Sequence, residues 1–369
     1  MKAWPFFAIA VVQASLCLAH WFIYRTWIDF WWPLSPLAAL ALRAFVFVLA
    51  MSFIVAALLG FRFSNWLVSA LYRVAAVWLG LLNFFFLAAC LCWVAWFACR
   101  LVGVHGNRPF IAATLFGLAL IAGVYGLLNA RLVRIRRVPV RLPGLPNSWR
   151  GRTALLFSDL HLGNINGPRF SRRIADMAAD LNPDIIFIPG DLFDGTHSDP
   201  NRLAAPFKDL SAPFGIYFAT GNHDEFGSAA HYTEAMKRVG IRVLENEKVT
   251  VDGLHIVGVT YGDSTSPLRL SALLESLHLA EGQASILLHH VPNRLPIVEK
   301  AGVSLQLSGH THGGQVFPFS WFTRRIFGKF TYGLQKFGAL QVYTSSGAGT
   351  WGPPMRVGTH PEIVLLAFE

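Results

Sequence analysis

Cysteine is scarce in this chain and confined to one part of it. The 369 residues include four cysteines, Cys17, Cys90, Cys92 and Cys99, and all lie in apolar runs near the N-terminus. The polar remainder of the chain therefore has neither a disulfide nor a thiolate metal site. It also has no cysteine nucleophile and no Gly-x-x-x-x-Gly-Lys-Ser/Thr loop, which argues against cysteine-based phosphatase chemistry and P-loop nucleotide chemistry.

Acidic residues are almost absent from residues 1–130, which contain one, Asp29, against 7 Lys and Arg residues. Over the whole chain, 14% of residues are charged, 54% are hydrophobic and the mean hydropathy is +0.45. This composition predicts that part of the chain sits in lipid. The net charge of +10 arises in that part and in residues 131–141, because residues 142–369 hold 19 basic and 20 acidic residues. We therefore expect no nucleic-acid partner.

Long apolar stretches occupy residues 4–24, 37–61, 71–97 and 110–128. Each reaches the roughly 20 residues that a helix needs to cross a bilayer. Residues 1–130 are thus predicted to form an N-terminal α-helical transmembrane bundle of about four spans. The first stretch is interpreted as a span rather than a signal peptide, because it is long and has no convincing cleavage site. Five arginines follow the last stretch, which predicts a multi-pass protein of the inner (cell) membrane with its C-terminal domain in the cytoplasm.

The second half of the sequence has the pattern of an α/β domain. Residues 131–149 are rich in Arg, Pro and Gly and are interpreted as a basic linker. Over residues 150–369, short apolar runs alternate with amphipathic ones, which predicts a layered α/β fold. Strands are expected at 153–158, 184–189, 216–220, 254–260, 285–289, 303–308, 340–345 and 363–368, and helices at 168–181, 200–210, 228–239 and 267–278.

Ligand-type residues follow five of these predicted strands. The clusters are Asp159-x-His161, Gly190-Asp191-x-x-Asp194, Gly221-Asn222-His223-Asp224, His289-His290-Val291-Pro292 and Gly309-His310-x-His312. Taken singly, each cluster is more simply explained as a turn or a buried histidine than as a metal ligand. Because the carboxyl ends of strands in α/β sheets converge, the five together predict one site. Imidazole, carboxylate and amide groups bind Mn²⁺, Fe or Zn²⁺, and bridging aspartates with terminal histidines suit a pair of ions.

This motif set resembles that of the calcineurin-like metallophosphoesterase superfamily over residues 150–369, which implies an αββα-type layered sandwich. Residues 309–315 and 344–356 resemble more narrowly the bacterial membrane-tethered branch related to transmembrane protein with metallophosphoesterase domain. That branch is also similar to enzymes that cleave UDP-2,3-diacylglucosamine, a lipid A precursor.

The resemblance implies a role for each motif residue. One ion would be bound by Asp159, His161, Asp191 and His312, and the other by Asp191, Asn222, His290 and His310. His290 is preferred to His289 because one residue and then proline follow it, and His289 would lie on the opposite face of the strand. His223 would be catalytic at the substrate phosphate, with Asp224 orienting its ring, while Asp194 would lie outside the ligand set.

The implied activity is hydrolysis of a phosphodiester or pyrophosphate bond by a metal-bridging hydroxide, with two divalent ions, Mn²⁺ favoured over Fe or Zn²⁺. The membrane spans favour a lipid or lipid-linked substrate such as UDP-2,3-diacylglucosamine, with membrane lipid as a partner. Residues 317–337 interleave aromatic and basic side chains, and they either rest on the membrane or cover a sheet edge. The alternatives are a broad-specificity phosphodiesterase or phosphatase on soluble esters, with the spans as an anchor, and a non-catalytic metal-binding scaffold or sensor.

Overall fold

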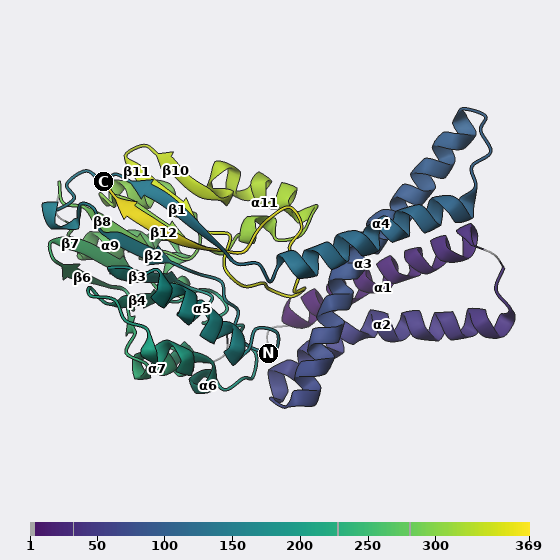
Figure 1. The fold of residues 1–369 in the computed structure, drawn as a ribbon, viewed down its shortest axis with the longest axis horizontal. Coiled ribbons are helices and arrows are strands. Elements are labelled where there is room, and N and C mark those ends of the chain that lie inside the picture. The colour runs from purple at the N-terminus through teal and green to yellow at the C-terminus, as the bar shows by residue number, and fades with distance from the viewer. Residues whose placement is uncertain (1–3, 32, 227–228, 280–281) are drawn as a thin grey trace. The chain divides into compact units, whose positions relative to one another are not determined.

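The computed structural model describes residues 4–31, 33–226, 229–279 and 282–369, and the chain divides into two compact units (Figure 1). The helical unit comprises Met1–Leu128 and Gly352–Val357. The α/β unit comprises Asn129–Trp351 and Gly358–Glu369. The chain therefore returns to the helical unit once, late in the sequence.

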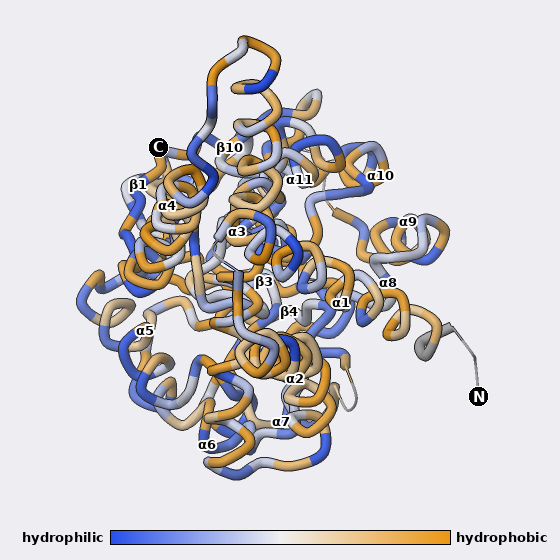
Figure 2. Tube along the Cα trace, turned by 90° about the vertical axis from the view of Figure 1, so that its right-hand side faces the viewer, coloured by the Kyte–Doolittle hydropathy of each residue, from blue (hydrophilic) through white to orange (hydrophobic). Residues whose placement is uncertain are grey.

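Four long helices make up most of the helical unit, as the sequence predicts. They are α1 (Trp4–Phe30), α2 (Pro36–Arg62), α3 (Trp66–Leu101) and α4 (Arg108–Asn129). All four are long and apolar enough to cross a membrane, with mean hydropathies from 1.7 to 2.6, and they are drawn mainly in orange in Figure 2. Ser35 and Asn65 cap the N-termini of α2 and α3, because their side chains accept hydrogen bonds from backbone N–H groups of the first turn.

Two hydrogen bonds between polar side chains join helices of the helical unit. The indole N–H of Trp78 donates to His20 over 2.8 Å, and that of Trp93 donates to the hydroxyl of Thr26 over 2.9 Å. Both bonds join α1 to α3. Polar groups in apolar surroundings need such partners, so these bonds help to hold the two helices together.

The α/β unit contains two six-stranded sheets with helices on their outer faces. Its strands are β1 (Arg134–Val140), β2 (Thr153–Leu156), β3 (Ile185–Pro189), β4 (Ile216–Ala219), β5 (Arg242–Val243), β6 (Glu247–Val251), β7 (Leu254–Gly258), β8 (Ser285–Leu288), β9 (Leu305–Ser308), β10 (Gly333–Phe337), β11 (Leu340–Thr344) and β12 (Glu362–Phe368). Its helices are α5 (Pro168–Asp180), α6 (Pro200–Ala204), α7 (Ala229–Arg238), α8 (Tyr261–Ser264), α9 (Pro267–Ser276), α10 (Leu295–Lys300) and α11 (Phe319–Phe327).

The strand order is β1-β12-β2-β3-β4-β5 in the first sheet and β10-β11-β9-β8-β7-β6 in the second. Strands β2 to β5 are mutually parallel, and so are β7, β8, β9 and β11. Parallel strands are covered on both faces, which explains apolar runs such as β3, whose five residues are all buried.

Alternate side chains of these strands supply three hydrophobic layers. Leu156 of β2 and Ile286 of β8 point into the core between the sheets. A neighbouring residue of each strand points outward: Leu155 packs in the layer beneath α5 and α7, and Leu287 in the layer beneath α9 and α10. The αββα sandwich expected from the sequence is therefore confirmed.

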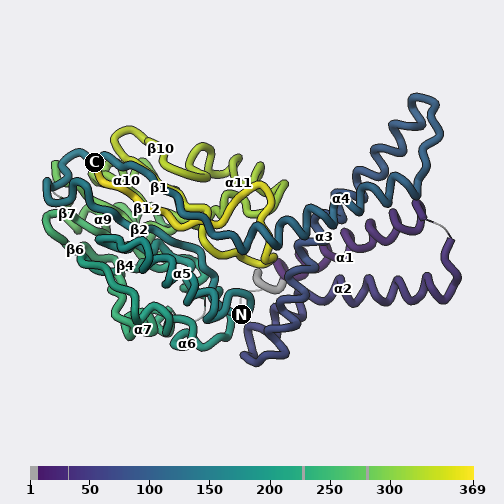
Figure 3. Tube along the Cα trace, in the orientation of Figure 1, coloured from purple at the N-terminus to yellow at the C-terminus, as the bar shows by residue number. Residues whose placement is uncertain are grey.

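The segment before the sandwich differs from the expected linker. Residues 134–140, within the predicted linker 131–149, form β1 and pair in parallel with β12, so Arg134 lies opposite Glu362 (Figure 3). Pairing with β12 gives this edge strand its backbone partners, although most of its side chains are exposed. The α/β unit therefore begins at Asn129 rather than near residue 150. Position 228, expected as the start of a helix, lies outside the described residues; α7 begins at Ala229.

Candidate metal centre

The ligand-type residues follow five strands from two sheets. In the first sheet they come directly after the parallel strands β2, β3 and β4, and in the second after the parallel strands β8 and β9. Atoms from both sheets meet: the Asp191 carboxylate, after β3, lies 3.1 Å from Nε2 of His290, after β8. The five clusters thus form one site where the carboxyl ends of the two sets of strands come together.

The backbone at this site is unusual. Five of the predicted ligands have left-handed conformations, with φ between 46° and 69°: Asp159, His161, Asp191, His310 and His312. Such φ values are uncommon outside glycine and cost about 1–3 kcal/mol each. They persist only where the surrounding structure holds them, and they concentrate at functional sites. The observed strain therefore supports a functional role for this cluster.

The first group of potential ligands is Asp159, His161 and His312, all buried and with donor atoms within 4.8 Å of one another. The two imidazole Nε2 atoms of His161 and His312 lie 3.1 Å apart, and Nε2 of His312 is 3.6 Å from the Asp159 carboxylate. Neighbouring groups hold this carboxylate: the Ser158 hydroxyl donates to one oxygen and the backbone N–H of His310 to the other.

The second group is Asp191, His290 and His310. The amide oxygen of Asn222 lies 3.0 Å from Nδ1 of His310, so Asn222 joins this group. The Asp191 carboxylate also lies 3.8 Å from Nε2 of His161, which belongs to the first group. Asp191 is therefore placed between the two groups, as a bridging ligand requires.

Charge within the site depends on Asp191. Burial disfavours its ionised form, but the neighbouring histidines, His290 above all, hold the pKa of its carboxyl well below the usual range. In turn Asp191 raises the pKa of His290 to about 9 against the effect of burial. Burial and the nearby charge of His290 lower the pKa of His310 to about 4. His310 is thus neutral at pH 7, which is the form of imidazole that binds a metal.

His223 lies at the edge of the first group. Its ring packs against that of His161 with centroids 4.7 Å apart, and its Nδ1 lies 3.2 Å from the carbonyl oxygen of Asp194. The carboxylate of Asp194 is 3.6 Å from Nδ1 of His161, and His161, Asp194 and His223 form a third group of potential ligands, two of which lie outside the expected ligand set. Trp351, which the sequence interpretation did not assign, covers His223 with a centroid separation of 5.6 Å.

Asp224 does not orient the ring of His223 as expected. Its carboxylate accepts hydrogen bonds from the backbone N–H groups of Gly221 and Phe193, at 2.8 and 2.9 Å. Burial, and then the charge of Asp191, raise the pKa of Asp224 to about 7. The partner of the His223 ring is instead the Asp194 carbonyl. Asp224 therefore joins two loops of the site by binding their backbones.

The paired histidines after β8 are separated as the strand pattern implies. His290 points into the site, and its Nδ1 lies 2.8 Å from the Pro189 carbonyl, which fixes the ring. His289 is fully buried and lies in none of the ligand groups among the described residues. Burial and the neighbouring His290 lower the pKa of His289 to about 3, so it is an uncharged interior residue.

Comparison with known proteins agrees with this geometry. A family model described as calcineurin-like phosphoesterase matches residues 153–314, the segment that carries every predicted ligand. The α/β unit belongs to the calcineurin-like metallophosphoesterase family. The match runs from β2 to the turn that holds His312, and it leaves β10, β11 and β12 outside.

Similar proteins occur in bacteria and animals. An uncharacterized metallophosphoesterase of Campylobacter jejuni is 30% identical over 260 residues, which cover 67% of this chain and 66% of the relative. The transmembrane protein with metallophosphoesterase domain of Danio rerio is 32% identical over 266 residues, covering 68% and 60%. That of Bos taurus is 29% identical over 303 residues, covering 75% and 67%. This chain thus spans less than two thirds of the length of the first two relatives.

Together with the four apolar helices, the names of the animal relatives indicate a membrane protein with a metallophosphoesterase domain.

Proposed function

We propose that this chain is a membrane-anchored phosphoesterase that uses two divalent ions to hydrolyse a phosphodiester or pyrophosphate bond. The observation that carries the proposal is the position of Asp191, 3.1 Å from His290 in one ligand group and 3.8 Å from His161 in the other. A carboxylate so placed suits a pair of ions, the arrangement that stabilises both attacking and leaving oxygens in phosphoryl transfer.

The donor set fits such ions. The close approach of the Nε2 atoms of His161 and His312 is favourable when both lone pairs face one cation, and the strained backbone holds them there. Carboxylate, imidazole and amide donors suit Mn²⁺, Fe or Zn²⁺. One ion would be held by Asp159, His161, Asp191 and His312, and the other by Asp191, Asn222, His290 and His310. When bound, such ions polarise phosphoryl oxygens and lower the pKa of water.

His223 is the residue placed to move a proton. Its Nδ1 faces the Asp194 carbonyl, so Nδ1 carries a hydrogen and Nε2 is left for the substrate. The described residues give Nε2 no hydrogen-bond partner. A proton exchanged at Nε2 would assist departure of the leaving oxygen. Trp351 and Phe226, whose rings contact that of His223, restrict water around it.

The lipid character of the substrate is supported by α11. None of its residues is buried, and Trp321, Phe322 and Ile326 are between 61% and 74% exposed. Arg324 and Arg325 lie on the same helix. Aromatic and basic side chains combined on an exposed helix are typical of segments that lie on an anionic membrane surface. This exposure favours the membrane as the partner of α11, whereas residues 333–337 form β10 at the edge of the second sheet. We propose UDP-2,3-diacylglucosamine as a substrate to test.

The arginines that follow α4 indicate on which side of the membrane the phosphoesterase domain lies. Arg131, Arg134, Arg136, Arg137 and Arg141 follow α4 closely, and arginine-rich segments near span ends stay in the cytoplasm. We therefore place the phosphoesterase domain on the cytoplasmic side of the inner (cell) membrane. A C-terminal fusion to a reporter that is active only outside the cytoplasm tests this placement, and an active reporter would reverse it.

The function is tested with full-length, detergent-purified protein supplied with Mn²⁺. Hydrolysis of UDP-2,3-diacylglucosamine and of bis-p-nitrophenyl phosphate is measured for the parent chain and for the Asp191→Ala and His223→Ala variants. His231→Ala, on the exposed side of α7, is the matched control for His223→Ala.

Turnover of the lipid substrate that only the first two variants lose would support a lipid-linked pyrophosphatase. Turnover of bis-p-nitrophenyl phosphate alone would indicate a phosphoesterase for other esters. Tight metal binding without turnover of either ester would refute the enzyme and favour a metal-loaded scaffold.

A further inference from the structure

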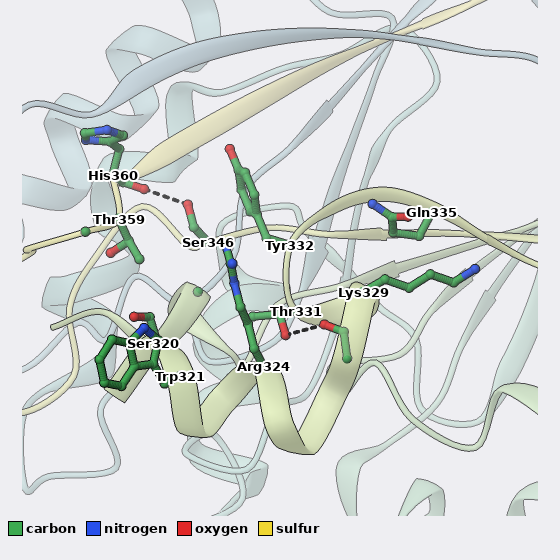
Figure 4. A pocket seen from close by; sticks show the side chains of 13 residues that line it. Ser320, Trp321, Arg324, Lys329, Thr331, Tyr332, Gln335, Ser346, Thr359 and His360 are labelled. Carbon is green, nitrogen blue, oxygen red and sulfur yellow. Dashed lines mark hydrogen bonds between the residues drawn. The ribbon is translucent and has the colours of Figure 1, made fainter. Parts of the chain in front are cut away.

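A pocket of about 730 Å³ lies in the α/β unit, bounded by α11, the loop after His312 and the segment Gly358–His360. Figure 4 shows Arg324 rising from α11 between Ser346 and Tyr332, with Lys329 and Gln335 to one side of it and Thr359 and His360 to the other. A cavity of this size accepts a small-molecule group rather than a single ion.

The pocket carries positive charge that the protein does not neutralise. Arg324 and Lys329 line it, and none of its 13 lining residues is Asp or Glu. Among the described residues, the Arg324 guanidinium has no ion-pair or hydrogen-bond partner, and the ammonium group of Lys329 lies 5.2 Å from the ring centre of Phe330. Guanidinium and ammonium groups left without anions in a concave site attract an anion from solution.

The carboxylate behind the pocket wall is already engaged. Glu362 is 3% exposed and accepts hydrogen bonds from the hydroxyl groups of Tyr332 and Tyr343 and from the backbone N–H of Ser346. Both cations are therefore left to a ligand. The hydroxyl group of Ser320, which also lines the pocket, adds a polar group that suits phosphate oxygens, whereas the Thr359 hydroxyl already donates to the carbonyl of Gln315 over 3.0 Å.

The pocket and the metal centre share one loop. Gly313 lines the pocket and directly follows His312, so about 3.8 Å of backbone separates a pocket residue from a metal ligand. The hydroxyl of Thr311 donates to the carbonyl of Thr331, another pocket residue, over 2.8 Å. A molecule with one phosphate at the metal centre is therefore able to place a second polar group in this pocket.

We propose that this pocket binds a phosphate-class anion, and that in the catalytic cycle the anion is a second, uncleaved phosphate of the substrate. The second part rests on the proposed function, whereas the first part does not. Arg324 and Lys329 bind the phosphate oxygens, and the exposed indole of Trp321 at the pocket supplies an apolar surface for the group attached to that phosphate.

The anion site is tested by binding, without catalysis. Inorganic pyrophosphate is titrated calorimetrically into the full-length protein after its metals have been removed with a chelator. Loss of one charge-assisted contact weakens binding by about tenfold or more, so Arg324→Gln and Lys329→Gln should each raise the dissociation constant by at least that factor. Arg325→Gln, one residue along α11 and outside the pocket lining, is the control and should change it less than about twofold. Equal binding by the parent and Arg324→Gln would overturn the site.

The assignment to the substrate is tested by kinetics with the metal-loaded protein. For Arg324→Gln, the KM for UDP-2,3-diacylglucosamine should rise about tenfold, while kcat/KM for bis-p-nitrophenyl phosphate, which has a single phosphate, should stay at the parent value. Weaker pyrophosphate binding with unchanged lipid kinetics would keep the anion site but assign it to a free phosphate compound. An equal loss on both substrates would overturn the proposal, because it would mean that Arg324 supports the metal centre itself.

Discussion

Replacement of Gly309 by alanine should disable the metal centre, although the substitution replaces none of the predicted metal ligands. A Cβ atom at Gly309 would lie 2.1 Å from Oδ2 of Asp159 and 2.6 Å from Oγ of Ser158. A relaxed contact needs more than about 3 Å, so the carboxylate must move by roughly 1 Å. It has no free direction in which to rotate, because Ser158 holds one of its oxygens and the backbone N–H of His310 holds the other.

The expected cost follows from that displacement. Misplacing a reacting or positioning group by about 1 Å lowers turnover by roughly 10²-fold, and overpacking a buried site costs about 1–3 kcal/mol of stability. The assay measures hydrolysis of bis-p-nitrophenyl phosphate across a Mn²⁺ titration, together with the metal content of the purified protein. Gly309→Ala should show about 100-fold lower kcat/KM and a weaker apparent affinity for Mn²⁺.

Gly167→Ala is the control. Its φ is −94° and no atom lies within 4 Å of the added Cβ, so the same substitution meets open space and should leave activity and metal affinity unchanged. Parent-like activity of Gly309→Ala, at parent-like Mn²⁺ affinity, would refute the reasoning. It would mean either that the loop moves freely or that the position of Asp159 does not matter for catalysis.

Three further predictions concern the same centre. Removing the metals with a chelator should abolish hydrolysis, and Mn²⁺, Fe²⁺ or Zn²⁺ should restore it; turnover that persists in protein with less than one bound ion per ten chains would contradict a metal mechanism. His223→Asn should lower kcat by about 10²–10⁴-fold with unchanged metal content, measured by elemental analysis, and coupled loss of metal would make His223 a ligand instead. Asp224→Ala should leave the backbone N–H groups of Gly221 and Phe193 unsatisfied and lower the free energy of unfolding by about 2–6 kcal/mol in a denaturant titration, whereas unchanged stability with lost activity would give Asp224 a catalytic role.

The elements that the sequence predicts well are those whose apolar residues face a core. β3 is a continuous run of buried residues and α5 repeats buried residues at helical spacing, and the positions of both match the prediction closely. β1 is not predicted as a strand because it lies at the edge of its sheet. Arg134, Arg136 and Arg137 are exposed, so its sequence has the composition of a basic linker. α11 is not predicted because none of its residues is buried, so its sequence carries no pattern of core-facing residues.

In the candidate site too, some features follow from the local sequence and others do not. Ligand types and their places after strands are local properties, and the proline two residues after His290 distinguishes it from His289, which strand alternation puts on the opposite face. The direction of the Asp224 side chain is not local, because its acceptor role depends on the N–H of Phe193, 31 residues earlier. Trp351 lies within residues 344–356, which carry a resemblance, but its place over His223 is not local, because it depends on a loop distant in sequence.

The pairing of β1 with β12 governs when the domain is able to fold. β1 follows the last apolar helix directly, whereas its partner consists of residues 362–368, far later in the chain. β12 also separates β1 from β2, so the first sheet cannot close across its middle until both distant segments are present. A chain without β12 would keep its apolar helices and its predicted metal ligands but would lack the strand that joins the two parts of this sheet. Closure of the first sheet thus depends on a contact between segments distant in sequence, which forms slowly because the intervening chain must first be brought together.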